Sequence, residues 1–316
     1  MADVRIFLGR WSALLQAAAS LALVAGCASH EESQESRESG EPEATTPSAL
    51  AGSTLDVTLP TGVVRVFRPA TAPASCEAVL FGVGTGLTTS SYQSLGSAIN
   101  GYGYVFVVMD HAPGNAFGKA DAARYAALAA DVKANLLGWL GASSPCAGVA
   151  HWIVGGHSAS GQAAHAAAIA NPQIAHAIFS ADPYDVSGLG SVTLPGLYWG
   201  FSSTTCFVGV NKAAKAAYAR TPNPGRAMHK TNTTMTWALC GYVPKYHHQS
   251  FIDYGLNLGT LGCSNCIQTP TSFYADVANS LNKFVVARFY GSWSKANLQV
   301  SNRSTPATLY VDGDQP

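Results

Sequence analysis

A serine flanked by small residues lies in the stretch GHSASG, residues 156–161. The apolar residues before it, ending at 153–155, predict a strand, and the small-residue run 160–170 after it predicts a helix. A serine on such a strand-to-helix turn projects its hydroxyl outward, and the helix N-terminus beside it offers N–H groups to an oxyanion. This arrangement indicates nucleophilic attack by Ser158 on a carbonyl carbon. The close approach of strand and helix needs small residues two before and two after the serine. Gly156 satisfies the first need, whereas Ser160 stands where glycine is usual, and Gly161 is expected to relieve the crowding.

A carboxylate that orients the base is expected after the next apolar run. Residues 177–180 predict a strand, and Asp182, Pro183 and Asp185 follow it. Side chains at the carboxyl ends of parallel strands gather at one sheet edge, where such folds place their chemistry. Pro183 favours an extended backbone at Asp182, which would direct this carboxylate across the edge. Asp185 is the alternative candidate for this carboxylate. The same residues could also form a plain Asp-Pro turn with only a structural role.

Two adjacent histidines, His247 and His248, are the candidates for the general base. A base needs a pKa near the working pH and a position within hydrogen-bond reach of the serine. Because neighbouring side chains diverge, we expect one functional histidine here rather than a two-histidine metal site. Five other histidines are interpreted as structural or surface groups: His111, His151, His165, His176 and His229.

The elements that must position these residues alternate along the chain. Alternation of strands and helices predicts an α/β protein with a mostly parallel central sheet and helices on both faces. Strands are expected at residues 63–67, 78–83, 104–109, 153–155, 177–180, 196–201 and 233–239, and helices at residues 91–100, 120–140, 160–170 and 274–290.

Three segments carry a family resemblance. They are GHSASG at residues 156–161, SYQSLGSAINGYGYVFVVMDH at residues 91–111 and HHQSFIDY at residues 247–254. The first resembles a GHSxGG motif, the second a helix and strand that follow an oxyanion loop, and the third a His-Gln-x-Phe-x-Asp-Phe segment. With gaps, over residues 60–290, the chain resembles the platelet-activating-factor acetylhydrolase and chlorophyllase branch of the α/β-hydrolases.

The resemblance implies an α/β-hydrolase fold with a catalytic triad of Ser158, Asp182 and His248. It also implies that the backbone N–H groups of Thr85 and Ala159 bind the oxyanion. The oxyanion loop of that branch starts with His-Gly, whereas VGTG, residues 83–86, takes its place here. The implied activity is hydrolysis of a small-molecule, lipid or polymeric carboxylic ester through an acyl-enzyme, without a cofactor or metal.

The N-terminal residues have the layout of an export signal. Arg5 and Arg10 precede an apolar run that ends in VAGC, residues 24–27. This ending resembles a bacterial lipobox, in which Cys27 carries the lipid and anchors the protein to a membrane; an ordinary secretory signal is the alternative. Residues 28–50 hold six of the chain's seven glutamates and predict a disordered tether. Residues 51–316 are then the catalytic domain, and its location is extracytoplasmic.

The charge of the domain argues against nucleic acid as a partner. The whole chain has 18 Lys and Arg residues and 18 Asp and Glu residues. Residues 1–50 contain three of the former and seven of the latter, so the domain has 15 against 11, without a basic cluster.

Six cysteines remain if Cys27 is set aside, and in an exported protein they predict up to three disulfides. In the expected fold, the strand that starts near Cys76 neighbours the strand that follows Cys146, so these two should pair. Zinc at the Cys-x-x-Cys of residues 263–266 is the alternative for the last pair, although no second such motif follows. The full expected pairing is Cys76–Cys146, Cys206–Cys240 and Cys263–Cys266.

Two rival functions share these residues. An acyltransferase or lactone hydrolase would use the same triad, and a catalytically inactive surface lipoprotein would use the cleft only to bind ligands. Tyr184, Trp199 and Phe201 could line an apolar acyl site, or they could belong to the core.

Overall fold

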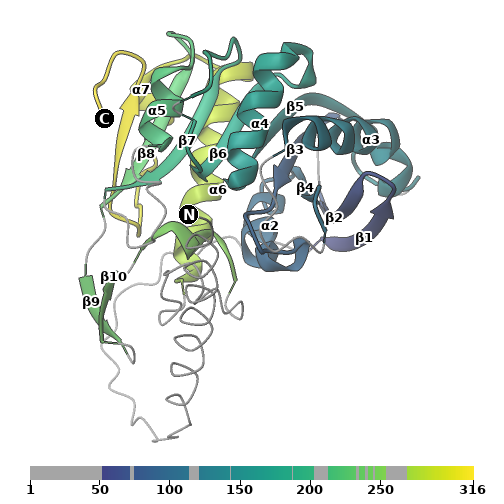
Figure 1. The fold of residues 1–316 in the computed structure, drawn as a ribbon, viewed down its shortest axis with the longest axis horizontal. Coiled ribbons are helices and arrows are strands. Elements are labelled where there is room, and N and C mark those ends of the chain that lie inside the picture. The colour runs from purple at the N-terminus through teal and green to yellow at the C-terminus, as the bar shows by residue number, and fades with distance from the viewer. Residues whose placement is uncertain are drawn as a thin grey trace, which may run out of the picture. The chain divides into compact units, whose positions relative to one another are not determined.

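The computed structural model covers most of the chain beyond residue 51 (Figure 1). It describes residues 52–71, 75–113, 121–142, 144–186, 188–202, 213–232, 235–238, 241–244, 246–253 and 269–316. All of these belong to one compact unit, Ala49–Pro316.

The described residues form a nine-stranded, mostly parallel sheet in the order β1-β2-β4-β3-β5-β6-β7-β8-β11. Adjacent strands from β4 to β8 in this order are parallel. The antiparallel hairpin β1–β2 extends one edge, and β11 pairs antiparallel with β8 at the other. The strands are β1 Ser53–Leu59, β2 Gly62–Arg68, β3 Ser75–Gly82, β4 Val105–Asp110, β5 Gly148–Ser158, β6 Ala177–Pro183, β7 Gly196–Phe201, β8 Arg226–Thr231 and β11 Ala307–Val311.

Helices cover both faces of the sheet, which makes the protein an α/β protein as predicted (Figure 1). One apolar layer lies between the sheet and the helices α2 and α6, and the other between the sheet and α3, α4 and α5. The helices are η1 Thr89–Tyr92, α2 Gln93–Asn100, α3 Ala122–Leu140, α4 Ala159–Ala170, η2 Pro172–Ile174, α5 Ala213–Ala219, η4 His248–Phe251, α6 Thr271–Val285, η6 Val286–Tyr290 and α7 Lys295–Leu298.

Strand β4 shows why the central strands are continuously apolar. Its sequence VFVVMD is buried throughout, because helices close both faces of a parallel sheet. Successive side chains alternate between the faces. Phe106 and Val108 belong to the layer under α2 and α6, whereas Val105 and Val107 belong to the layer under α3, α4 and α5.

One of the strands predicted for the central sheet is wrong. The expected strand at residues 233–239 does not join the main sheet. Its described part is β9, Met235–Ala238, which pairs with β10, Gly241–Pro244, in a separate two-stranded sheet. The main sheet ends instead with β8 and β11. Strand β8 has the polar sequence RAMHKT, and its His229 is buried because the ring stacks on Trp199 and Nδ1 accepts a hydrogen bond from Arg303 at 2.9 Å.

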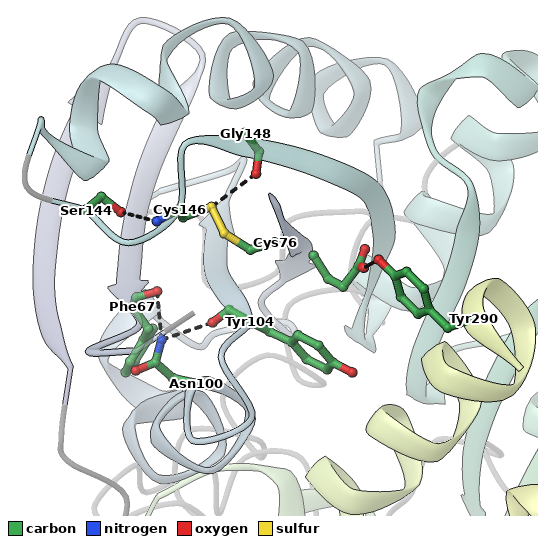
Figure 2. Close-up of a disulfide and its surroundings, with 9 residues drawn as sticks. Phe67, Cys76, Asn100, Tyr104, Ser144, Cys146, Gly148 and Tyr290 are labelled. Atoms are coloured by element: carbon green, nitrogen blue, oxygen red, sulfur yellow. Dashed lines mark hydrogen bonds between the residues drawn. A yellow bond between two sulfur atoms is a disulfide. The ribbon is translucent and has the colours of Figure 1, made fainter. Parts of the chain in front are cut away.

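The amino-terminal ends of β3 and β5 are linked by a disulfide between Cys76 and Cys146 (Figure 2). Their Cα atoms are 5.7 Å apart, because β3 and β5 are neighbouring parallel strands. This pairing and the strand order behind it were predicted. On the same part of the sheet, the buried Glu77 accepts a hydrogen bond from the Tyr290 hydroxyl and lies 3.1 Å from Nδ1 of His151.

Several predictions fall outside the described residues. These are the export signal and tether of residues 1–50 with Cys27, the two further disulfides of Cys206, Cys240, Cys263 and Cys266, and the zinc alternative. In the part of the chain that the structure describes, no helix has both the length and the apolar character needed to cross a bilayer.

Candidate active site

Ser158 lies at the junction of β5 and α4, where the sequence predicted a sharp turn. Its backbone has φ 54° and ψ −120°. A positive φ is costly for a residue with a Cβ, so the surrounding packing must hold this conformation in place. Ser158 is the N-cap of α4 and Ala159 is its first residue. The Ala159 N–H therefore points out of the helix N-terminus without a partner inside the helix.

Glycines on two strands make room for this turn. A Cβ on Gly156 would lie 2.8 Å from the carbonyl oxygen of Gly82, and a Cβ on Gly82 would lie 2.4 Å from the Cβ of Ser160. Gly161 makes a different contact, because its Cβ would meet Pro183 and the Gly156 carbonyl. Gly161 therefore relieves the crowding between α4 and the end of β5, as predicted, and Gly82, at the end of β3, provides the space that the Ser160 side chain needs.

The hydroxyl of Ser160 has a partner of its own. It donates a hydrogen bond to the carbonyl of Val83. The Val83 N–H donates to Met109 at the end of β4 at 3.0 Å, so this loop is tied to α4 on one side and to β4 on the other. A serine in place of the usual glycine thus anchors the segment expected to hold the oxyanion.

The segment after Val83 forms a tight turn. The Leu87 N–H donates to the Gly84 carbonyl at 3.1 Å, which places Thr85 and Gly86 at the two central positions. Gly86 has φ 72°, a conformation that the third position of a type II turn requires and that glycine adopts without cost. The two expected oxyanion donors thus lie at the carboxyl ends of neighbouring strands, with Thr85 following β3 and Ala159 following β5.

Asp182 occupies the matching position on β6, beside the end of β5. Its side chain is 1% exposed, and Oδ2 lies 2.7 Å from Nδ1 of His248. Burial raises the pKa of Asp182, and the hydrogen bond with His248 opposes this rise. The φ of Asp182 is 42°, so the extended backbone predicted from Pro183 is wrong. Asp185 is exposed, and its carbonyl accepts a hydrogen bond from the side chain of Gln162.

The two adjacent histidines have different roles in the local structure. His247 is the N-cap of the short helix η4, and its Nδ1 accepts a hydrogen bond from the Gln249 N–H at 3.3 Å. Burial lowers the pKa of His247 to about 4, so this ring is neutral over most of the pH range. His248 faces Asp182 instead. Its ring centroid is 4.4 Å from that of His157, the residue directly before Ser158.

Asp253 holds the loop of His248 against the helix α2. Its carboxylate accepts a hydrogen bond from the Ser94 N–H at 2.9 Å, and its own N–H donates to the carbonyl of Ser91 at 2.8 Å. A carboxylate at a helix N-terminus satisfies free N–H groups and interacts favourably with the helix dipole. The hydroxyl of Tyr274 on α6 also donates to Ile252 in this loop, at 2.7 Å.

The aromatic residues considered for an acyl site divide into two groups. Trp199 and Phe201 are fully buried in the layer under α2 and α6 and belong to the core, whereas Tyr184 is partly exposed just beyond the end of β6. Within the described ranges, no group of three His, Cys, Asp or Glu side chains is arranged to hold a metal ion.

No protein-family model matches the chain, and no curated protein matches it either.

Proposed function

We propose that this chain is a serine hydrolase with an α/β-hydrolase fold and that it cleaves carboxylic esters with Ser158, His248 and Asp182 as its triad. One observation carries the proposal. The buried hydrogen bond of 2.7 Å between His248 and Asp182 lies at the sheet edge where Ser158 stands on a turn of positive φ. The order Ser, Asp, His along the chain and the mostly parallel sheet further support it.

The reaction begins when the Ser158 hydroxyl attacks the ester carbonyl and His248 takes its proton. Because Asp182 accepts the hydrogen bond from Nδ1–H of His248, it fixes the tautomer whose Nε2 is free to act as the base. Asp182 then stabilises the imidazolium without taking up the proton.

The tetrahedral oxyanion is bound by the N–H groups of Thr85 and Ala159. Each such donor contributes about 3 kcal/mol to transition-state stabilisation in comparable sites. The intermediate expels the alcohol, which takes a proton from His248, and leaves an acyl ester on Ser158. Water, deprotonated by His248, attacks this ester, and the carboxylic acid leaves as Ser158 regains its proton.

Substitution of the triad tests the proposal. Ser158→Ala and His248→Ala should each lower the hydrolysis of a short p-nitrophenyl ester by a factor of order 10⁵–10⁶, because triad members act as a unit. His176→Ala is a matched control, since His176 is an exposed histidine before the amino end of β6. Near-normal turnover by His248→Ala would exclude it as the base.

We also propose that the protein works outside the cytoplasm. The disulfide of Cys76 and Cys146 supports this location, because such bonds persist in oxidising compartments. Mass spectrometry of the N-terminus in the native host tests the lipid anchor. A diacylated Cys27 supports it, and an unmodified N-terminus beyond this residue means simple secretion.

A further inference from the structure

His157 connects the two loops that flank Ser158. Its Nδ1 lies 3.0 Å from the hydroxyl of Tyr92, and its Nε2 lies 2.9 Å from the carbonyl oxygen of His248. The Tyr92 hydroxyl in turn accepts a hydrogen bond from the Gly84 N–H at 2.8 Å. These contacts form one continuous chain from the loop expected to bind the oxyanion to the backbone of the expected base.

The chemistry of the groups determines the direction of each hydrogen bond in this series. A carbonyl oxygen can only accept, so Nε2 of His157 must carry a proton. Burial lowers the pKa of His157 well below its usual value, so the ring is neutral and Nδ1 is an acceptor. The single proton of the Tyr92 hydroxyl must then point to Nδ1, which leaves the oxygen to accept from Gly84.

We propose that His157 and Tyr92 are positioning residues, which hold the oxyanion loop and the loop of His248 in fixed positions relative to Ser158. They do so through a neutral His157 that keeps its proton on Nε2. This inference rests on the proposed function for its catalytic meaning. The hydrogen-bond chain itself does not depend on it.

The burial of both side chains excludes direct contact with substrate as their role. His157 is 1% exposed and Tyr92 is fully buried. The packing around them is also tight, because a Cβ on Gly84 would lie 2.9 Å from Nδ1 of His157. Only glycine allows the loop to come this close to the ring. Both residues therefore act through the backbone of the groups that touch the substrate.

The tautomer of His157 can be measured directly on the full chain. Ring ¹⁵N shifts in a long-range ¹H–¹⁵N spectrum distinguish protonated from unprotonated ring nitrogens, and the His157 signals are those missing in His157→Gln. We expect a neutral ring with a protonated Nε2 at pH 7. An Nδ1–H tautomer, or a charged ring, would overturn the proposal whatever the catalytic activity.

Tyr92→Phe tests the link to the oxyanion loop. Removal of the hydroxyl leaves two buried polar groups unpaired, and we expect kcat to fall about 10- to 100-fold with KM little changed. Tyr198→Phe is the matched control, because Tyr198 is equally buried and its hydroxyl binds Thr221 at 2.6 Å in the other apolar layer. If Tyr92→Phe and Tyr198→Phe lose the same stability and have the same kcat, Tyr92 has only a structural role and the proposal is overturned.

Two substitutions of His157 test the link to His248. The amide of His157→Gln can still donate to the His248 carbonyl, whereas His157→Leu cannot. We expect kcat within about tenfold of wild type for the former and a loss of about 100-fold or more for the latter. Equal activity of the two variants contradicts the proposal. If the wild-type protein itself hydrolyses no ester and leaves Ser158 unreactive toward a fluorophosphonate, the proposed function fails, while the ¹⁵N spectrum still decides the tautomer.

Discussion

Gly82→Ala tests most directly the close packing of β3 against α4 at the turn that carries Ser158. The new methyl group would lie 2.4 Å from the Cβ of Ser160, 2.8 Å from its Oγ and 3.1 Å from Cε2 of Tyr125. The first contact is more than 1 Å shorter than carbon atoms prefer, and α4 and β3 are both held in place by the core. Overpacking of this kind costs about 1–3 kcal/mol, and we expect a value near the upper end.

A double-mutant cycle isolates this contact. Ser160→Gly alone should cost about 1–2 kcal/mol, because it removes the hydrogen bond to Val83 and adds a glycine to the first turn of α4. In the variant that carries both changes, the clash with the Ser160 side chain is gone, whereas the contact with Tyr125 remains. We therefore expect the double variant to be about 1–2 kcal/mol more stable than the sum of the single effects predicts.

Urea unfolding monitored by circular dichroism measures these free energies. Gly148→Ala, at the start of β5, is the control for a glycine-to-alanine change in a strand, because its added Cβ would meet nothing within 4 Å. Gly82→Ala should also slow ester hydrolysis, since any shift of α4 moves Ser158. If Gly82→Ala is tolerated as well as Gly148→Ala, or if the two effects simply add, the close packing inferred for the turn is wrong.

Three further predictions concern the acid, the disulfide and the buried His247. Asp182→Asn should lower kcat by about 10³–10⁴, whereas Asp185→Asn should cost less than about tenfold; the reverse result in steady-state assays would refute the assignment of the acid. Replacing Cys76 and Cys146 by serine should lower the free energy of unfolding by about 4 kcal/mol in the chain-entropy model, since the bond joins positions 70 residues apart. The pKa of His247 is about 4 in the folded protein and 6.5 in the unfolded chain. Its contribution to the free energy of unfolding is therefore fully present above pH 6.5 and is lost as the pH falls toward 4. Its share of the loss between pH 7 and 5 is about 2 kcal/mol, and a His247→Gln variant with the same pH profile as wild type in urea unfolding would contradict this.

The sequence was sufficient to predict those elements whose structure is determined by local patterns. The apolar runs predicted β4, β6 and β7, and the run of small residues predicted α4 directly after Ser158. The order of β3 and β5 led to the pairing of Cys76 with Cys146. The position after β6 favoured Asp182 and the family resemblance selected His248; the two side chains do meet, although the backbone of Asp182 proved to have a positive φ.

The sequence failed where a contact depends on distant partners. Strand β8 escaped prediction because its sequence is polar, although His229 and Thr231 are buried and the His229 ring stacks on Trp199. The importance of Gly82 was missed because its neighbour in space, Ser160, lies 78 positions along the chain. The hydrogen bond between Tyr92 and His157 joins residues 65 positions apart, and no spacing in the sequence predicts it.

The proposed function requires Ser158 to be an activated nucleophile. Incubation of the full chain with a fluorophosphonate, followed by peptide mass spectrometry, measures this directly, because only a serine whose proton is withdrawn by a neighbouring base reacts quickly. We expect stoichiometric labelling of Ser158, slowed by several orders of magnitude in His248→Ala and absent in Ser158→Ala. A folded wild-type protein in which Ser158 stays unlabelled, or in which another serine carries the label, would contradict it.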